Sequence, residues 1–148
     1  MVTSRGVEIG LKTSFNVGKV VLELNGAYTW VSSKVKKGAT DTDASIGNQL
    51  IYVPQHQAKG HLSVHFGRLF FLYGHQFTGL RFTSSDNESS LPAYQIGFLS
   101  VGYEVPIKKH SIGLNLTIDN IFNTEYQTIV WRPMPGRSFL INLNYQFL

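Results

Sequence analysis

The five histidines are the side chains of this sequence best suited to binding a metal ion. His61 and His65 lie four residues apart in a segment of alternating character, so they share one face of a predicted strand. At the rise of a strand they stand roughly 13 Å apart, which is too far for both to hold one ion. We find no third ligand beside them, and the chain has no cysteine. We therefore predict no metal site and no cofactor.

A hydrolytic site would require a nucleophile, a base and an orienting acid or amide that converge in space. Ser63 beside His61 or His65 supplies two of these groups, and Asn115 or Asp119 could supply the third. Side chains this common meet by chance, and the sequence around Ser63 lacks a nucleophile-elbow pattern. The glycines never form the spacing of a phosphate-binding loop. We therefore predict that the protein is not an enzyme.

These polar residues lie in segments where apolar and polar residues alternate, which is the pattern of strands with one apolar and one polar face. The alternation is strictest at residues 112–119 and 139–147, which we predict as the last two strands. On the closing strand the polar positions hold the amides Asn142, Asn144 and Gln146. An uncharged polar face of this kind suits a wall between hydrocarbon and a wet lumen.

The composition agrees with a membrane β-barrel. Only 15% of the 148 residues are charged and 13% are aromatic. No stretch approaches the roughly 18 uninterrupted apolar residues of a spanning helix, whereas a spanning strand needs only about 9–11 residues. The net charge of +4 is scattered apart from Lys34, Lys36 and Lys37. We interpret that cluster as a solvated loop and predict no nucleic-acid partner.

Seven strands can be placed, and two of them carry irregular patterns. Besides the last two, they cover about residues 5–15, 19–32, 56–67, 69–82 and 93–105. The faces of the fourth strand cannot be assigned from its pattern. In the fifth, the apolar residues first occupy every second position as Tyr94, Ile96 and Phe98. From Leu99 onward they occupy the other set of alternate positions. A one-residue slip flips every later side chain, so we expect a β-bulge near Phe98.

Two regularities indicate a barrel wall. The mid-strand charges all fall on polar faces: Glu8, Lys12, Lys19, Glu23, Lys59, Glu104 and Asp119. The connections alternate short and long, like the periplasmic turns and extracellular loops of outer-membrane barrels. Bacterial barrels use an even number of strands, at least eight. We therefore predict an all-β, antiparallel up-and-down transmembrane segment of about seven strands, which is a partial barrel.

The motifs of the last third carry a family resemblance. Residues 119–126 read Asp-Asn-Ile-Phe-Asn-Thr-Glu-Tyr, residues 132–137 read Arg-Pro-Met-Pro-Gly-Arg, and the closing strand bears aromatics at alternate positions. With Arg-Gly-Val-Glu at 5–8 and Tyr-Val-Pro-Gln-His at 52–56, the chain resembles the C-terminal part of a TonB-dependent outer-membrane receptor. Members commonly end on an aromatic residue, whereas here Phe147 is followed by Leu148.

The resemblance implies a 22-stranded barrel with a plug in its lumen. Residues 1–148 would be its C-terminal portion, and the plug domain and the N-terminal barrel strands would be absent. Met1 to Arg5 lead directly into a strand pattern with no export signal. We therefore expect that the sequence is not the complete precursor.

By the same resemblance, the protein would be an uptake receptor in the outer membrane of a Gram-negative bacterium. It would import a scarce nutrient such as an iron chelate, cobalamin or a glycan, energised by the inner-membrane TonB complex through the missing plug. Its other partners would be outer-membrane lipid and the imported ligand. The loops at 33–55, 83–92 and 127–136 would contribute to the mouth. The candidate binding residues that line the lumen are Lys59, His61, His65, Asn115, Asn142 and Asn144.

A small soluble β-barrel that binds an apolar ligand is the alternative. It requires the apolar face to point inward and Lys59, His61 and Asn142 to face water. Long, charge-poor strands and the terminal motifs argue against it, and solubility without detergent would favour it.

Overall fold

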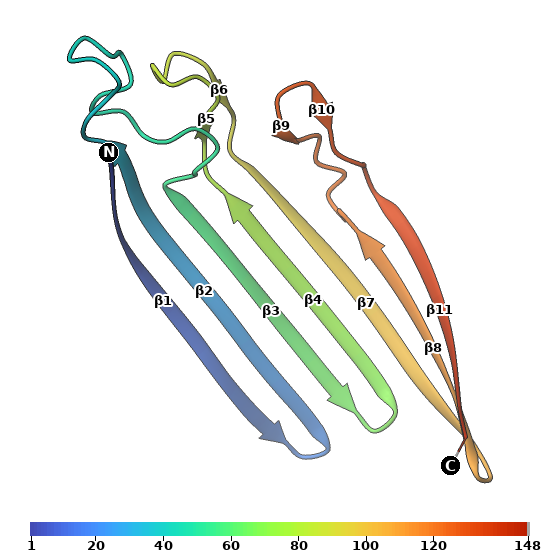
Figure 1. Ribbon diagram of the computed structural model, residues 1–148. Coiled ribbons are helices and arrows are strands. Elements are labelled where there is room, and N and C mark those ends of the chain that lie inside the picture. The colour runs from blue at the N-terminus through green and yellow to red at the C-terminus, as the bar shows by residue number, and fades with distance from the viewer. Residues whose placement is uncertain (148) are drawn as a thin grey trace.

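A computed structural model describes residues 1–147, so the terminal Leu148 lies outside the described residues. Seven strands form one antiparallel sheet in the order β1-β2-β3-β4-β7-β8-β11 (Figure 1). Their bounds are β1 (Val2–Val17), β2 (Val20–Val35), β3 (His56–Phe66), β4 (Leu69–Thr78), β7 (Tyr94–Ile107), β8 (His110–Asp119) and β11 (Ser138–Phe147). The predicted all-β, up-and-down architecture of seven strands is confirmed.

Four further strands, all of two or three residues, lie inside the loops. β5 (Arg81–Phe82) pairs with β6 (Ser90–Leu91), and β9 (Gln127–Ile129) pairs with β10 (Arg132–Pro133). Such short strands carry too few residues for an alternation to be read. The sequence therefore predicted plain loops where the structure has two small hairpins.

Each short turn is a two-residue connection at the same end of the sheet (Figure 1). Its first residue is left-handed in all three turns, at φ 60° for Gly18, 59° for Gly67 and 55° for Lys108. Two-residue hairpins favour such residues because their twist matches that of the strands. The short and long connections therefore alternate as predicted, although Lys19 lies in a turn and not within a strand.

Strand register assigns every residue of the sheet to one of two faces. On one face Val101, Leu116 and Ile141 form a row across β7, β8 and β11. We call this the apolar face. On the opposite face Asn115 lies beside Asn142, and we call this the polar face. The six predicted charges that lie in strands all fall on it: Glu8, Lys12, Glu23, Lys59, Glu104 and Asp119.

The apolar side chains point outward instead of forming a core. Among residues 1–147, Leu91 is the one buried hydrophobic residue, whereas Phe139, Ile141 and Leu143 are each about 70% exposed, at 72%, 69% and 72%. Water would strongly oppose such a surface. Hydrocarbon would accept it, since a barrel wall presents apolar residues to lipid. In the described part of the chain, no helix is long and apolar enough to cross a membrane.

The prediction of a β-bulge near Phe98 is wrong. The pairing of β7 with β4 and β8 runs from Tyr94 to Ile107 without a register shift. Tyr94, Ile96 and Phe98 therefore lie on the polar face. The polar face carries apolar residues at these three positions because loop residues such as Tyr126 cover this part of it, and apolar side chains can pack against that cover.

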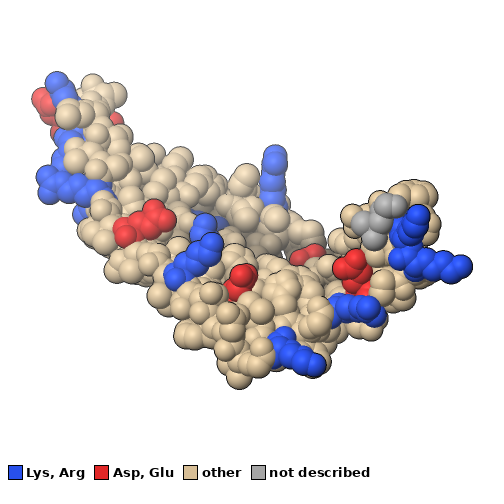
Figure 2. Space-filling view, turned by 90° about the horizontal axis from the view of Figure 1, so that it is seen from below, with Lys and Arg blue, Asp and Glu red and all other residues tan. Residues whose placement is uncertain are grey.

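The sheet is curved. Figure 2 shows the molecule from below, from the side of the short turns, as a shell that is hollow on one side. The cavities described below are lined mostly by residues of the polar face. The hollow is therefore the side on which ligand-binding residues are expected.

Candidate ligand-binding face

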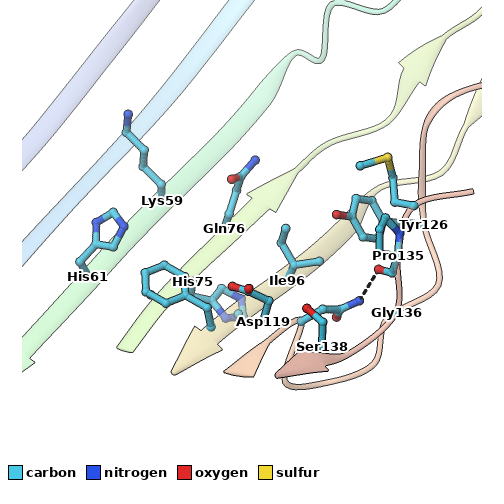
Figure 3. A pocket seen from close by; sticks show the side chains of 15 residues that line it. Lys59, His61, His75, Gln76, Ile96, Asp119, Tyr126, Pro135, Gly136 and Ser138 are labelled. Atoms are coloured by element: carbon cyan, nitrogen blue, oxygen red, sulfur yellow. Dashed lines mark hydrogen bonds between the residues drawn. The ribbon is translucent and has the colours of Figure 1, made fainter. Parts of the chain in front are cut away.

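The central cavity lies on the polar face near its loop end. It has a volume of about 420 Å³. Lys59 and His61 of β3 lie at one side, and Tyr126 and Pro135 of the last long loop lie at the other (Figure 3). The sheet beneath contributes these lining residues: Gly74, Gln76, Ile96, Phe98, Asp119 and Ser138. The lining thus combines a cation, a carboxylate, amide and hydroxyl groups, and an aromatic wall.

Strand pairing explains why Lys59, His61 and Phe98 line this cavity together. Lys59 lies opposite Gln76 in the β3–β4 pair, and His61 lies opposite Gly74. Because Gly74 lacks a side chain, the Phe98 ring occupies the space above it. A Cβ at Gly74 would clash with that ring. Phe98 thereby reaches His61, and the two ring centroids lie 5.9 Å apart.

The six predicted binding residues share the polar face but not one site. Lys59 and His61 line the central cavity. His65, Asn115 and Asn144 line a separate cavity of about 360 Å³ toward the short turns. Asn142 is paired with Asn115 across the β8–β11 ladder. The residues divide into two groups because His61 and His65 are four residues apart on one strand.

Asn115 is held in a hydrogen-bond network. Its Oδ1 accepts hydrogen bonds from Ser100 Oγ at 2.7 Å and from Thr117 Oγ1 at 3.3 Å, and the two hydroxyls lie 3.0 Å apart. Ser100 is buried. This network joins β7 to β8, so Asn115 has a structural role in addition to any role in binding.

The histidines occupy separate environments. His56 Nδ1 lies 2.7 Å from Tyr28 Oη, and His75 Nδ1 lies 3.0 Å from Tyr73 Oη. His110 stacks on Tyr145. Within residues 1–147, no three His, Asp or Glu side chains come together as a metal site. The Ser63 hydroxyl considered above as a nucleophile donates to Glu23 Oε2 at 3.3 Å.

Residues 120–123 form a clamp beside the central cavity. Asn120 is buried and left-handed, with φ 48°. Its Oδ1 accepts from Thr124 N at 2.9 Å, and its Nδ2 donates to Thr124 O at 2.9 Å and to Pro135 O at 3.4 Å. Asn123 Oδ1 accepts from Arg137 N at 2.9 Å. The asparagines of this motif therefore fix the loop that enters the last strand.

Phe122, between these asparagines, lies against the other face of the sheet. A Cβ on Gly97 would come within 2.9 Å of its ring, and the ring lies 5.7 Å from that of His75. His75 and Gly97 are paired on the apolar face. Phe98 over Gly74 and Phe122 over Gly97 therefore fill glycine gaps on opposite faces at the same place in the β4–β7 ladder.

The first two long loops are joined at the mouth. Asn87 Oδ1 accepts from Gln49 N at 2.9 Å, and Asn87 Nδ2 donates to Gln49 O at 3.0 Å. The buried Gln49 accepts from Ser33 N through its Oε1 at 3.0 Å. Asn87 is left-handed, with φ 62°, a conformation that asparagine tolerates. The Asn87 amide thus connects loop 83–89 to loop 36–55 and, through Gln49, to β2, and Asn48 Nδ2 adds a hydrogen bond to Ser85 O at 3.3 Å.

Three loop residues have shifted pKa values. Hydrogen bonds from the Ser45 side chain, from the Ser45 backbone and from Ala39 N–H lower the pKa of Asp43 to about 2. The Ser84 hydroxyl, followed by Glu88 N–H, lowers the pKa of Asp86. Burial raises the pKa of Tyr126, with a further contribution from Tyr94. The two aspartates therefore remain charged and the Tyr126 hydroxyl remains a donor near neutral pH.

Some lining residues were not among the predicted ones. Asp119 and Tyr126 lay in the motif that carries the family resemblance, but that motif gave no indication of a cavity. Gln76 was missed because the faces of the fourth strand could not be assigned. The apparent phase slip at Tyr94, Ile96 and Phe98 was the one available signal, because apolar residues on a polar face mark a covered surface.

Comparison with known proteins gives consistent results. The family model described as TonB dependent receptor-like, beta-barrel, matches residues 1–121. The vitamin B12 transporter BtuB of Vibrio cholerae is 30% identical over 112 residues, which cover 72% of this chain and 18% of the transporter. This chain thus spans less than a fifth of the length of that relative.

Solved structures share the fold. The siderophore receptor PiuA of Acinetobacter baumannii superposes with a TM-score of 0.82 at 22% identity, over 96% of this chain and 21% of the receptor. BauA, the ferric preacinetobactin receptor of the same species, gives 0.68 at 15% identity, over 97% of this chain and 27% of the receptor. These structures share the fold, and the family match over residues 1–121 shows that the chain belongs to the β-barrel family of TonB-dependent receptors.

Proposed function

We propose that this chain is the C-terminal part of the barrel of an outer-membrane uptake receptor in a Gram-negative bacterium. The plug and the N-terminal barrel strands would lie outside residues 1–148. The observation that carries the proposal is the division of one sheet into an outward apolar face and a hollow polar face with cavities. In a barrel, the first would contact lipid and the second would line the lumen.

The ligand would be a scarce nutrient such as an iron chelate, cobalamin or a glycan, and TonB would energise its import. The relatives support the first two classes, since one is a vitamin B12 transporter and others are siderophore receptors. The central cavity would form part of the ligand path, with Lys59 and His61 in its wall. His65, Asn115, Asn142 and Asn144 would line the path farther toward the short turns. The proposal includes no enzymatic activity, in keeping with receptors and transporters as relatives.

A soluble barrel with an apolar interior is disfavoured by two observations. The cavities lie on the polar face, and β1 and β11, at the ends of the strand order, do not pair with each other among residues 1–147. The apolar face therefore encloses no ligand site in the described sheet.

Uptake measurements in the source bacterium test the function. Deletion of the gene should lower the energy-dependent uptake of radiolabelled cobalamin or of ⁵⁵Fe supplied as a chelate, and a plasmid copy should restore it. Fractionation should place the protein in the outer membrane. Unchanged uptake of every ligand, or recovery of the protein in the soluble fraction, would overturn the proposal.

The DNA upstream of the Met1 codon, read in all three frames, tests the domain proposal. A plug-like domain and further strand patterns should precede residue 1. A promoter and an export signal immediately ahead of Met1 would contradict it.

A further inference from the structure

We propose that Tyr126 is a ring-stacking residue of the ligand path, which selects ligands that present a planar aromatic ring carrying a hydrogen-bond acceptor. The inference rests on the proposed function, because it concerns a ligand that enters the hollow of the polar face. Three features of Tyr126 support it: its position between two cavities, the stacked side chains of Tyr94 and Arg81 that hold its ring, and its protonated hydroxyl.

Tyr126 borders two cavities. One is the central cavity, and the other, here called the rim cavity, has a volume of about 560 Å³ and lies between the last two long loops. Met134 and Gly136 also border both. The rim cavity includes Leu91, Pro92 and Glu125 in its lining. The half-buried Tyr126 is therefore placed to contact a ligand in either cavity.

A column of three side chains fixes that ring. Tyr126 stacks on Tyr94, with ring centroids 4.5 Å apart and planes inclined by 27°. Arg81 also lies over the Tyr94 ring, with its Cζ 4.8 Å from the ring centroid. Offset-stacked aromatic pairs and a cation over an aromatic face are both attractive arrangements. Met134 N donates to Tyr126 O at 3.0 Å, which anchors the backbone as well.

Arg81 is suited to holding this column and not to binding a ligand itself. It is only 4% exposed, and its Nη2 donates to Pro92 O at 3.1 Å. Its Nε has no hydrogen-bond partner among residues 1–147. A buried cation requires compensation, and the face of the Tyr94 ring supplies it. Arg81 is therefore a positioning residue that acts on Tyr126 through Tyr94.

The chemistry of Tyr126 indicates the ligand class. A ring held by stacking on one face presents its remaining surface without a further loss of side-chain freedom, which favours binding of a second flat ring. Burial keeps the hydroxyl protonated to higher pH, so it donates a hydrogen bond. Ile96 and Phe98 extend the apolar wall of the central cavity. A planar ring with an acceptor group matches these features, whereas a saturated ring of the same outline does not.

The test compares two acids of equal charge and similar outline, 2-naphthoate and trans-decahydro-2-naphthoate. Each is titrated calorimetrically into the full chain, purified from membranes in detergent. A stacked pair contributes about 0.5–1.5 kcal/mol, so 2-naphthoate should bind roughly 2- to 12-fold more tightly. Tyr126→Leu should abolish this preference, and Tyr126→Phe should retain most of it.

Tyr28→Leu is the control, because Tyr28 is a tyrosine of the apolar face, on β2, and borders neither of the two cavities beside Tyr126. It should leave the preference unchanged. Arg81→Gln should reduce the preference, and Arg81→Lys should restore part of it by returning the cation. Equal affinities for the two acids in the wild-type chain, or a preference that survives Tyr126→Leu, would overturn the inference.

A second measurement takes its main signal from the wild-type chain and uses only the conservative variant Tyr126→Phe to assign it. In the wild-type chain with ¹³C-labelled tyrosine, nuclear Overhauser contacts should join a tyrosine ring to 2-naphthoate, and Tyr126→Phe should remove that signal. Their absence would also overturn the inference. Discrimination between the acids without cellular uptake would overturn the proposed function alone, and uptake without discrimination would overturn this inference alone.

Discussion

The two faces of the sheet differ in how regular their side chains are. On the apolar face, side chains alternate regularly and remain exposed, as at Leu116 and Leu143. On the polar face, the same strands carry charges, amides, an inward Phe98 and the floors of several cavities. The first face requires only apolar side chains, whereas the second requires particular side chains in particular positions around its cavities. A pattern of residue types can specify the first requirement but not the second.

Charge substitution gives the largest contrast between the faces. Leu116→Arg should destabilise the membrane-inserted protein by about 2–4 kcal/mol, because it places a cation against lipid. Asn115→Arg, on the polar face, should cost less, because it loses only the hydrogen bonds with Ser100 and Thr117. Leu143→Arg and Asn142→Arg form a second matched pair, in which Asn142→Arg should be tolerated. The measurement is the fraction of heat-modifiable, folded protein recovered in lipid vesicles. Equal tolerance of the two substitutions in each pair would show that the faces are wrongly assigned.

Removal of the clamp amide should have the next largest effect. Asn120→Ala deletes all three hydrogen bonds of a buried side chain and leaves Thr124 N without an acceptor. We expect a loss of about 1–3 kcal/mol in a denaturant titration.

Two variants serve as controls for the clamp. Asn120→Asp keeps the oxygen that accepts from Thr124 N, but at neutral pH it buries a negative charge against the carbonyl oxygens of Thr124 and Pro135, so it should be no milder than Asn120→Ala. Asn144→Ala removes an exposed amide of the polar face and should change stability by no more than about 0.5 kcal/mol. Equal effects of Asn120→Ala and Asn144→Ala would show that the clamp does not stabilise the sheet.

The sequence predicted the strands much better than the ligand-binding face. The residue pattern placed all seven long strands and the side of six of the seven predicted charges, because burial in lipid acts on every second residue. It failed at Phe98, whose inward ring is accommodated by Gly74 on a neighbouring strand. It separated His61 from His65 along the strand, but it did not show which residues of the neighbouring strands complete a cavity around each of them. Both depend on pairings between residues distant in sequence.

The mouth offers a smaller and local test. Asn87→Ala should release loop 83–89 from Gln49 and raise the rate of protease cleavage in both loops, while the unfolding midpoint of the sheet changes little. Asn87→Gly keeps the left-handed backbone but lacks the amide. It should therefore be cleaved like the alanine variant if the hydrogen bonds matter. Protection in the glycine variant would instead assign the effect to backbone conformation.

The smallest expected effect depends on pH. Because the pKa of Asp43 is lowered from 3.8 to about 2, its contribution to loop order is complete above pH 3.8 and is lost as the pH falls through about 2. Hydrogen exchange at Ala39 and Ser45 N–H, which donate to Asp43, should accelerate in that window beyond the intrinsic pH trend. Asp43→Asn should remove the transition. A transition in that variant would assign it to another group.

The two phenylalanines that fill glycine gaps have a consequence for how this family varies. A methyl group at position 97 would press on the Phe122 ring, so a relative with alanine there needs a smaller side chain at the position equivalent to 122. The same reciprocity links positions 74 and 98. In an alignment of relatives, we therefore expect the side-chain volumes at the two positions of each pair to vary together, a larger residue at one accompanying a smaller residue at the other. One double exchange, Gly97→Ala with Phe122→Leu, should then be milder than the sum of its two single changes.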